Sequence, residues 1–174
     1  QLSNDFENSY HYSNAGIRLR KQVSKYNYAL GFGLQEANLG GKVTNGIKDT
    51  LINTRFNNIL PVARFQYFFS KIKNFNLNYS TSSNQPSVSQ KQPVTDVSDP
   101  LHIVQGNVNL KQEYIHSFRF NVALLNPFLN RNLFIFVNMQ QTQNKIVNYT
   151  TLLPYGKDST TYVNVNGVYD MNGT

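Results

Sequence analysis

Residues 26–35 alternate strictly between large apolar side chains and small or polar ones. The large set is Tyr26, Tyr28, Leu30, Phe32 and Leu34. Successive side chains of a β-strand point to opposite faces, so the segment predicts a strand with one apolar and one polar face. About ten residues is also the length that a tilted strand needs to cross the hydrocarbon layer of a bilayer. The pattern therefore favours a transmembrane β-strand.

The same alternation recurs along the chain. It predicts further strands at residues 7–20, 58–69, 75–82, 113–125, 132–143 and 160–170. The strand at 132–143 is expected to extend through 149–153, before a hairpin tip at Gly156, Lys157 and Asp158. Pro61 cannot donate to a ladder, so it is expected near the start of its strand or at a bulge. No helix of any length is predicted, and the fold class is all-β.

The connections between these strands alternate between short and long. Short turns are expected at residues 21–25, 70–74 and 126–131, whereas residues 37–57 and 83–112 form long connections. Barrels of an outer membrane have tight turns on the periplasmic side and long loops outside. A soluble sandwich has shorter and more even spacings. The order therefore predicts an antiparallel up-and-down transmembrane β-barrel segment, about seven strands of a larger barrel, with both long connections as external loops.

Composition narrows the choice of environment and partner. No apolar run reaches the length of about 18 residues that a transmembrane helix needs, and the chain has no cysteine for a disulfide or a thiolate metal site. The net charge of +7 is compatible with nucleic acid. The basic residues fall mostly beside turns, however, and make no stripe with aromatic platforms: Arg18, Arg20, Lys21, Lys25, Lys71, Lys73 and Arg131. We therefore expect no nucleic-acid partner, and a solvated or headgroup-facing rim of cations.

Residues 76–113 carry prolines, acidic residues and a glycine in a characteristic order. The positions are Leu77, Tyr79, Pro86, Ser87, Pro93, Asp96, Asp99, Pro100, Leu101, Gly106, Asn107, Asn109, Leu110 and Glu113. This order resembles the barrel segment of TonB-dependent receptor-like proteins of the Gram-negative outer membrane. Val108 and Gln112 stand where that family has prolines, which loosens the likeness of the local backbone but leaves the order intact.

The resemblance covers residues 58–167 and implies a barrel of about 22 strands with an N-terminal plug, energised through TonB from the inner membrane. It implies as partners the outer-membrane lipid, the remainder of the barrel, the plug domain, the TonB energy-coupling system and, as a further candidate, a surface lipoprotein. About seven strands cannot close such a barrel. Residues 1–174 are therefore expected to be a partial barrel with no plug domain and no signal peptide in this piece. The parent protein is expected to import or gate a glycan, a peptide or a metal chelate.

The long connection 83–112 supplies the candidate site residues. Asp96, Asp99 and Asn107 are candidates for contacts with an external ligand, whereas the structural interpretation is that Asp99 and Asn107 cap turns and Gly106 gives a permissive backbone. Two carboxylates without a spaced loop pattern are weak support for calcium. His11, His102 and His116 have no partner at metal-ligand spacing. No catalytic constellation is present, so we expect neither an enzyme nor a bound cofactor.

Aromatic pairs near the turns are interpreted as membrane-interface girdle residues: Tyr26 with Tyr28, Phe68 with Phe69, and Phe134 with Phe136. Phe134 and Phe136 lie on the polar side of their strand, which simple alternation does not explain. The alternative fold is a soluble β-sandwich or adhesin-like module that binds a carbohydrate or a protein through its long loops. That alternative requires a second sheet to cover Leu30, Phe32 and Phe120 and also Phe118.

Overall fold

The main feature of the fold is an open antiparallel sheet with the strand order β1-β2-β3-β4-β7-β8-β11. The computed structural model describes residues 5–44, 49–92 and 95–173 of the chain, with side chains at 9–41, 53–92 and 99–173. The strands are β1 Asp5–Gln22, β2 Tyr26–Thr44, β3 Asp49–Ser70, β4 Lys73–Asn84, β7 Glu113–Asn126, β8 Arg131–Gln143 and β11 Val168–Gly173. Each pairs antiparallel with its neighbour. The predicted all-β, up-and-down arrangement is confirmed.

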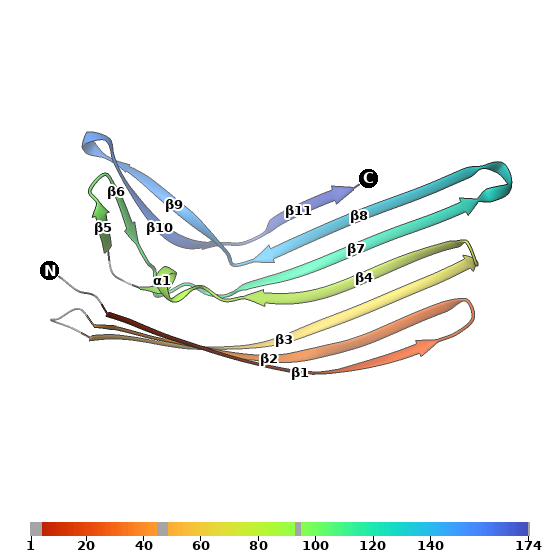
Figure 1. Ribbon diagram of the computed structural model, residues 1–174, viewed down its shortest axis with the longest axis horizontal. Helices are drawn as coiled ribbons and strands as arrows, with labels where there is room; N and C mark the ends of the chain where they lie inside the picture. The colour runs from red at the N-terminus through yellow and green to blue at the C-terminus, as the bar shows by residue number, and fades with distance from the viewer. Residues whose placement is uncertain (1–4, 45–48, 93–94, 174) are drawn as a thin grey trace.

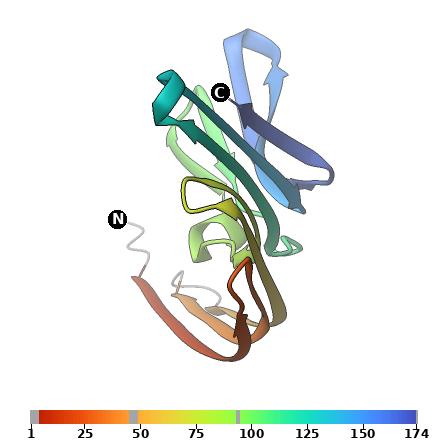
Figure 2. The ribbon, with the colours of Figure 1, turned by 90° about the vertical axis from the view of Figure 1, so that its right-hand side faces the viewer.

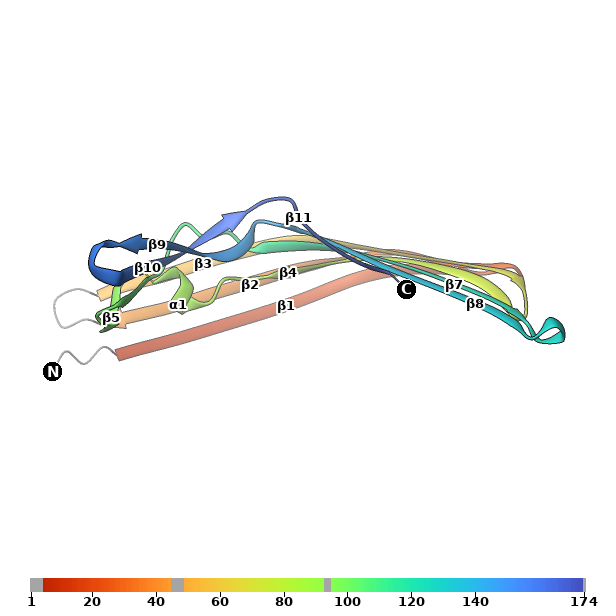
Figure 3. The same cartoon turned by 90° about the horizontal axis from the view of Figure 1, so that it is seen from above.

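The two ends of the long strands differ (Figure 1). The tight turns after β1, β3 and β7 lie together at one end, and the smaller elements lie at the other. These are α1 Val88–Lys91, β5 Thr95–Asp99, β6 His102–Gln105, β9 Lys145–Leu153 and β10 Lys157–Val165. The last four form a second sheet, in which β6 and β10 run parallel. Seen from above, this second sheet stays at the end away from the turns (Figure 3). No described helix is both long and apolar enough to cross a membrane.

Residues 37–57 are not the loop that was predicted. β2 continues to Thr44 and β3 already begins at Asp49, so the hairpin extends well beyond the membrane-crossing part. The glycine pair Gly40–Gly41 suggested a turn, yet both residues stay in the β2–β3 ladder. The period of two in fact continues here, because Ala37 and Leu39 are buried on one face while Asn38 between them is only half-buried.

Pro61 lies in the middle of β3 and not at its start, because β3 begins at Asp49, nine residues before the predicted start at Asn58. It is opposite Phe32 of β2, and the ladder to β4 begins only at the next residue, Val62. The Pro61 carbonyl accepts a hydrogen bond from the Thr81 hydroxyl at 2.9 Å. Pro61 therefore lies at a position of β3 where no backbone N–H is needed for the ladder to β4.

The hairpin tip and the seventh predicted strand also differ in detail. The tip is the turn η2, Pro154–Gly156, and Lys157 and Asp158 already belong to β10. The predicted strand 160–170 is divided into β10 and β11 by residue Gly167, whose φ is 73°. Opposite this break, Asn144 separates β8 from β9 with φ 52°. Both strands of the long hairpin therefore change direction at the same level, where they pass from one sheet to the other.

One face of the large sheet carries a band of apolar side chains from edge to edge. A single cross-strand row runs through Leu19, Leu30, Ala63, Tyr79, Phe118, Met139 and Met171. Leu19 is 73 % exposed, Leu30 56 % and Met171 72 %. A soluble sandwich would cover these side chains with a second sheet, and no described element does so. The sandwich alternative is therefore wrong, and hydrocarbon is the environment that such a face requires.

Rings gather on this apolar face toward the turns. Tyr67 lies 5.0 Å from Phe69 and 6.0 Å from Phe75, measured between ring centroids. Tyr26 stacks on Tyr28 at 6.4 Å. The aromatic girdle is thus supported for these residues. It is wrong for Phe68, Phe134 and Phe136. Phe68 pairs with Asn74 and Phe136 with Asn121, so these three rings lie on the opposite, polar face.

The small buried core lies at the end away from the turns, on the concave side of the sheet. Viewed from the turn end, the sheet curves and α1 lies inside the curve (Figure 2). Val88 of α1 is buried together with Ala37, Leu39 and Phe56 of the extended β2–β3 hairpin. The concave face therefore changes character along the strands, from a core beneath α1 to an open polar surface nearer the turns.

Candidate functional site

A cross-strand row that we call the arginine row crosses the concave face from edge to edge. Its members are Arg20, Ala29, Arg64, Asn78, Arg119, Asn138 and Asn172, one from each strand. Arginine alternates with a neutral side chain along the row. Arg119 donates from Nε to Asn138 Oδ1 at 3.1 Å, and Arg20, Arg64 and Arg119 are all exposed.

The rows on either side are also polar. The row farther from the turns contains Arg18, Gly31, Val62, Ser80, Ser117, Gln140 and Asp170. The row nearer the turns contains Gln22, Asn27, Gln66, Asn76, Asn121 and Phe136. Arg119, Asn138 and Asp170 contribute to the lining of a shallow hollow of ≈ 210 Å³. Amides, hydroxyls and guanidinium groups of this kind bind polar solutes through hydrogen bonds, and they present no nucleophile with a base beside it.

A network of amides closes the polar surface at the end away from the turns. Asn58 and Gln112 exchange two side-chain hydrogen bonds, one of them, from Asn58 Nδ2 to Gln112 Oε1, at 2.9 Å. Asn58 also donates to Ser83 Oγ at 3.0 Å, and Ser83 donates to Gln35 Oε1 at 2.8 Å. Gln35 and Asn58 are buried, so these bonds satisfy groups that would be costly to leave unpaired. The network ties β2, β3 and β4 to the loop before β7.

The loop that follows β4 is fixed on the concave face by its own sequence. Pro86 is fully buried, and Ser87 caps α1 by accepting from Gln90 N at 3.1 Å. The Gln90 side chain accepts from Ser87 N at 2.9 Å, which completes a capping box. The Pro-Ser pair of the sequence pattern is thus a structural element of the loop.

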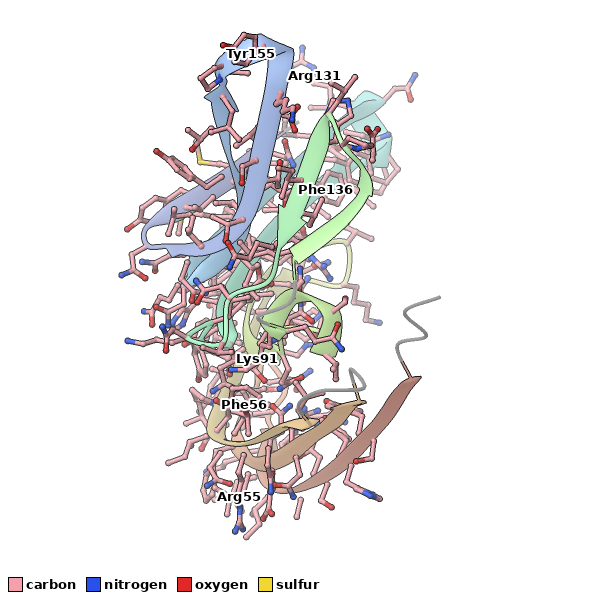
Figure 4. All side chains as sticks on the ribbon, turned by 90° about the vertical axis from the view of Figure 1, so that its left-hand side faces the viewer. Arg55, Phe56, Lys91, Arg131, Phe136 and Tyr155 are labelled. Carbon is pink, nitrogen blue, oxygen red and sulfur yellow. The ribbon has the colours of Figure 1, made fainter. Side chains whose placement is uncertain are left out.

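Lys91 is the buried cation of this loop. Its side chain is 4 % exposed, its Nζ donates to the Leu110 carbonyl at 3.1 Å, and it lies 6.0 Å from the centroid of the Phe56 ring. Figure 4 shows Phe56 on the Lys91 side of β3, with the neighbouring Arg55 pointing the other way. Burial lowers the pKa of the Lys91 ammonium. Arg55 forms an ion pair with Glu36 at 2.8 Å, and the hydrogen bond from Arg55 lowers the pKa of the Glu36 carboxyl, with a smaller contribution from Asn38.

The predicted ligand-contact residues do not form one described cluster. Asp99 Oδ1 accepts from Leu101 N at 2.9 Å in the β5–β6 turn. Asn107 donates from Nδ2 to the Tyr162 carbonyl at 2.9 Å and accepts from Asn109 N at 3.0 Å. The side chain of Asp96 lies outside the described residues. Asp99 and Asn107 therefore have the turn-stabilising contacts of the structural interpretation, and their contact with a ligand stays a prediction.

Gly106 lies where the backbones of two chain segments approach closely. A Cβ at this position would lie 2.1 Å from the Gln92 carbonyl oxygen and 2.9 Å from that of Gln90. Asn107 N donates to the Gln90 carbonyl at 2.7 Å, which holds the two chain segments together. Glycine is thus required by the close approach of two backbones rather than by a turn.

Titratable groups outside the arginine row offer little chemistry. His102 Nδ1 lies 2.8 Å from Asp158 Oδ2, and His116 Nδ1 lies 2.9 Å from the Tyr79 hydroxyl. In the part of the chain with described side chains, no three His, Asp, Glu or Cys residues converge as a metal site. The chemistry that the concave face offers is thus hydrogen bonding through its amides, hydroxyls and guanidinium groups.

The arginine row is the feature that sequence reasoning missed. The sequence predicts a solvated or headgroup-facing rim for Arg18 and Arg20 because they precede a turn. The register places both on the concave polar face with Arg64 and Arg119, so the solvated environment agrees with the structure and the headgroup-facing one does not. In the sequence, the alternation of residues 63–69 and 118–124 already predicts a polar face for Arg64 and for Arg119. Their alignment depends on the register between hairpins, which the sequence does not display.

Comparisons with known proteins agree with this architecture. The sequence description of the outer membrane protein beta-barrel family matches residues 1–173. Among solved structures, the siderophore receptor PirA from Pseudomonas aeruginosa is similar, with a TM-score of 0.54 and 10 % sequence identity. The match covers 98 % of this chain and 39 % of the receptor chain. No curated protein sequence matches.

Proposed function

Because the chain belongs to the outer membrane protein beta-barrel family, we propose that it forms part of the wall of a larger barrel that imports a nutrient such as a glycan, a peptide or a metal chelate. The observation that carries the proposal is the two-faced sheet. Its apolar face suits the hydrocarbon of the outer membrane, and its concave polar face suits a lumen through which a solute passes. The receptor-like fold supports uptake in place of enzymatic activity.

Further strands complete the barrel in this proposal. The order of the seven strands leaves β1 and β11 as edges, and unpaired backbone groups in hydrocarbon cost several kcal/mol each. The remainder of the barrel and a plug domain are therefore the proposed covalent or assembled partners. Energy coupling through TonB and a surface lipoprotein partner follow from the resemblance of residues 58–167 to TonB-dependent receptors. Asp96, Asp99 and Asn107 are proposed external-loop contacts.

Uptake measurements test the proposal in the intact bacterium. A strain that lacks the protein is compared with its parent for uptake of radiolabelled ferric chelates, oligosaccharides and peptides. We expect the deletion strain to lose uptake of one class of solute. If TonB supplies the energy, a protonophore should abolish uptake of the same class in the parent strain. Unchanged uptake of all three classes in the deletion strain would falsify the transport role.

A further inference from the structure

The arginine row and the two rows beside it have an unbalanced charge. The three rows hold Arg18, Arg20, Arg64 and Arg119 against a single carboxylate, Asp170, on the last strand. Within the described residues, the recorded ion pairs are Arg55 with Glu36 and His102 with Asp158, and neither involves these four arginines. The concave wall is therefore positive at this level.

The spacing of the arginines lets their fields overlap. Arg20, Arg64 and Arg119 lie on alternate strands of the sheet. Neighbouring strands are about 4.8 Å apart, so consecutive arginines of the row begin roughly 10 Å from one another. That separation is close to the Debye length at physiological ionic strength, about 8 Å, and a low-dielectric wall behind the charges concentrates the potential further.

The neighbours of these arginines do not neutralise them. Between Arg20 and Arg64 lies Ala29, and between Arg64 and Arg119 lies Asn78. A row built for wall stability would place carboxylates at these positions, since like charges side by side are destabilising. The exposed guanidinium groups instead offer planar pairs of donors toward the concave side, the geometry that matches carboxylate and phosphate oxygens.

We propose that the arginine row binds the oxyanion groups, carboxylate or phosphate, of an anionic solute that passes along the concave wall. The inference rests on the proposed transport function and adds the charge class of the solute. Arg18 extends the positive surface away from the turns. Ser80, Ser117 and Gln140, which lie next to the arginine row on β4, β7 and β8, supply neutral hydrogen-bonding groups. An anion is thus drawn toward the row and held there by guanidinium donors from β1, β3 and β7.

A single introduced thiol measures the potential at the row directly. The chain has no cysteine, so Ser117→Cys places one reporter on the concave face, two residues from Arg119, in an otherwise cysteine-free form of the intact protein. Its reaction rates with a sulfonate and with a trimethylammonium methanethiosulfonate are compared, each divided by the rate for a free thiol. We expect a normalised anion-to-cation rate ratio of about 10 or more, the lower end of electrostatic steering in charged clefts.

Substitutions then assign the ratio to the row. Arg64→Gln with Arg119→Gln is expected to lower the ratio several-fold, whereas Arg55→Gln, which removes one positive charge from outside the row, should leave it unchanged. Citrate and inorganic phosphate should slow the labelling more than chloride at equal ionic strength. Stronger protection by citrate indicates a carboxylate ligand, and stronger protection by phosphate indicates a phosphate ligand. Folding of each variant is checked by its heat-modifiable electrophoretic band.

Three results overturn the inference. The first is a normalised ratio near one, or one that the double substitution leaves unchanged. The second is a thiol that reacts with neither reagent, since another part of the protein then covers the row. The third is equal protection by chloride, citrate and phosphate. Uptake in the deletion strain separates the two proposals. If uptake is lost and the ratio is near one, only the anionic character of the solute is rejected. If uptake is unchanged, the transport function itself is rejected.

Discussion

Lys91 is a buried ammonium group at the end of the sheet away from the turns, where α1 lies against the concave face. Its ordinary pKa is 10.5, and burial lowers this value in the folded protein. Between the lowered folded-state pKa and 10.5 the unfolded chain binds more protons than the folded one. Stability therefore rises as the pH increases through this window, and the burial cost is fully present below it.

This sign gives a test with Lys91→Met. Methionine keeps an unbranched, flexible side chain and removes the cost of burying an ammonium, but it leaves the Leu110 carbonyl without its donor. Because the two effects oppose each other, we expect the free energy of unfolding near neutral pH to change by about 1 kcal/mol or less. The difference in stability between wild type and variant should shift in favour of wild type between about pH 8 and about pH 10, because only wild type has the Lys91 proton to lose. Urea unfolding in detergent at both pH values measures the shift. A difference that does not change with pH contradicts the assignment.

Gly106 gives the second prediction at this scale. Gly106→Ala forces a Cβ into the Gln92 carbonyl oxygen, at 2.1 Å, so the two backbones must separate. We expect a cost of about 1–3 kcal/mol, the range for overpacked sites, and faster proteolysis of the loop between β4 and β7. Val108→Ala is the matched control, because Val108 is exposed in the same loop. Equal protease resistance of Gly106→Ala and wild type would show that the loop tolerates the separation.

Among the elements, strands were predictable and register between hairpins was not. The alternation located six of the seven strands of the large sheet, since one face meets hydrocarbon and the other does not, and it merged part of β11 with β10. Within the first hairpin the predicted turn at residues 21–25 would place Arg20 opposite Tyr26, whereas β1 continues to Gln22 and pairs Arg20 with Ala29. The stagger between hairpins is set by the shear of the whole sheet, a property of the assembled strands. That is why the row containing Arg64 and Arg119 emerged only from the structure.

The sequence predicted a turn wrongly where a strand contains residues that are common in turns. Gly40 and Gly41 read as a turn, yet they pair with Asn53 and Ile52 in an extended hairpin. In the loop of residues 83–112, by contrast, short elements depend on contacts distant in sequence. The β5–β6 pair is held through β10, more than 50 residues later, with Ile103 opposite Ser159. No periodicity within the loop encodes such a partner.

One amide at the junction between the two sheets joins three backbone groups. Asn164 accepts from Lys111 N at 2.8 Å and donates to the Lys111 carbonyl at 3.0 Å and the Asn144 carbonyl at 2.6 Å. Asn164→Ala leaves three backbone groups without this partner, and we expect a loss of about 1–3 kcal/mol in local stability. Hydrogen exchange should become faster at the Lys111 amide. Asn148→Ala is the control, since Asn148 is exposed on β9; equal exchange at Lys111 in both variants would exclude the anchoring role.

At the scale of the whole molecule, the two faces of the sheet have different solvents and therefore different rules for substitution. Phe120 lies on the apolar face, in the row of Tyr28, Phe65, Leu77 and Val137. Its sequence neighbour Asn121 lies on the concave face, between Asn76 of β4 and Phe136 of β8. The same cation introduced at these adjacent positions therefore meets hydrocarbon in one case and a polar, hydrated surface in the other.

Phe120→Arg is expected to destabilise the folded barrel in lipid vesicles by about 2–4 kcal/mol, the cost of a cation facing lipid near the bilayer midplane. Asn121→Arg should cost about 1 kcal/mol or less, because the concave side already accommodates arginines on the same strands. Urea titration of the intact protein in phosphatidylcholine vesicles, followed by the heat-modifiable electrophoretic band, compares the two. The order of the effects matters more than their size. If Asn121→Arg were the more damaging change, the hydrocarbon would lie on the concave side, and both the lumen and the anion-binding row would be assigned to the wrong face of the wall.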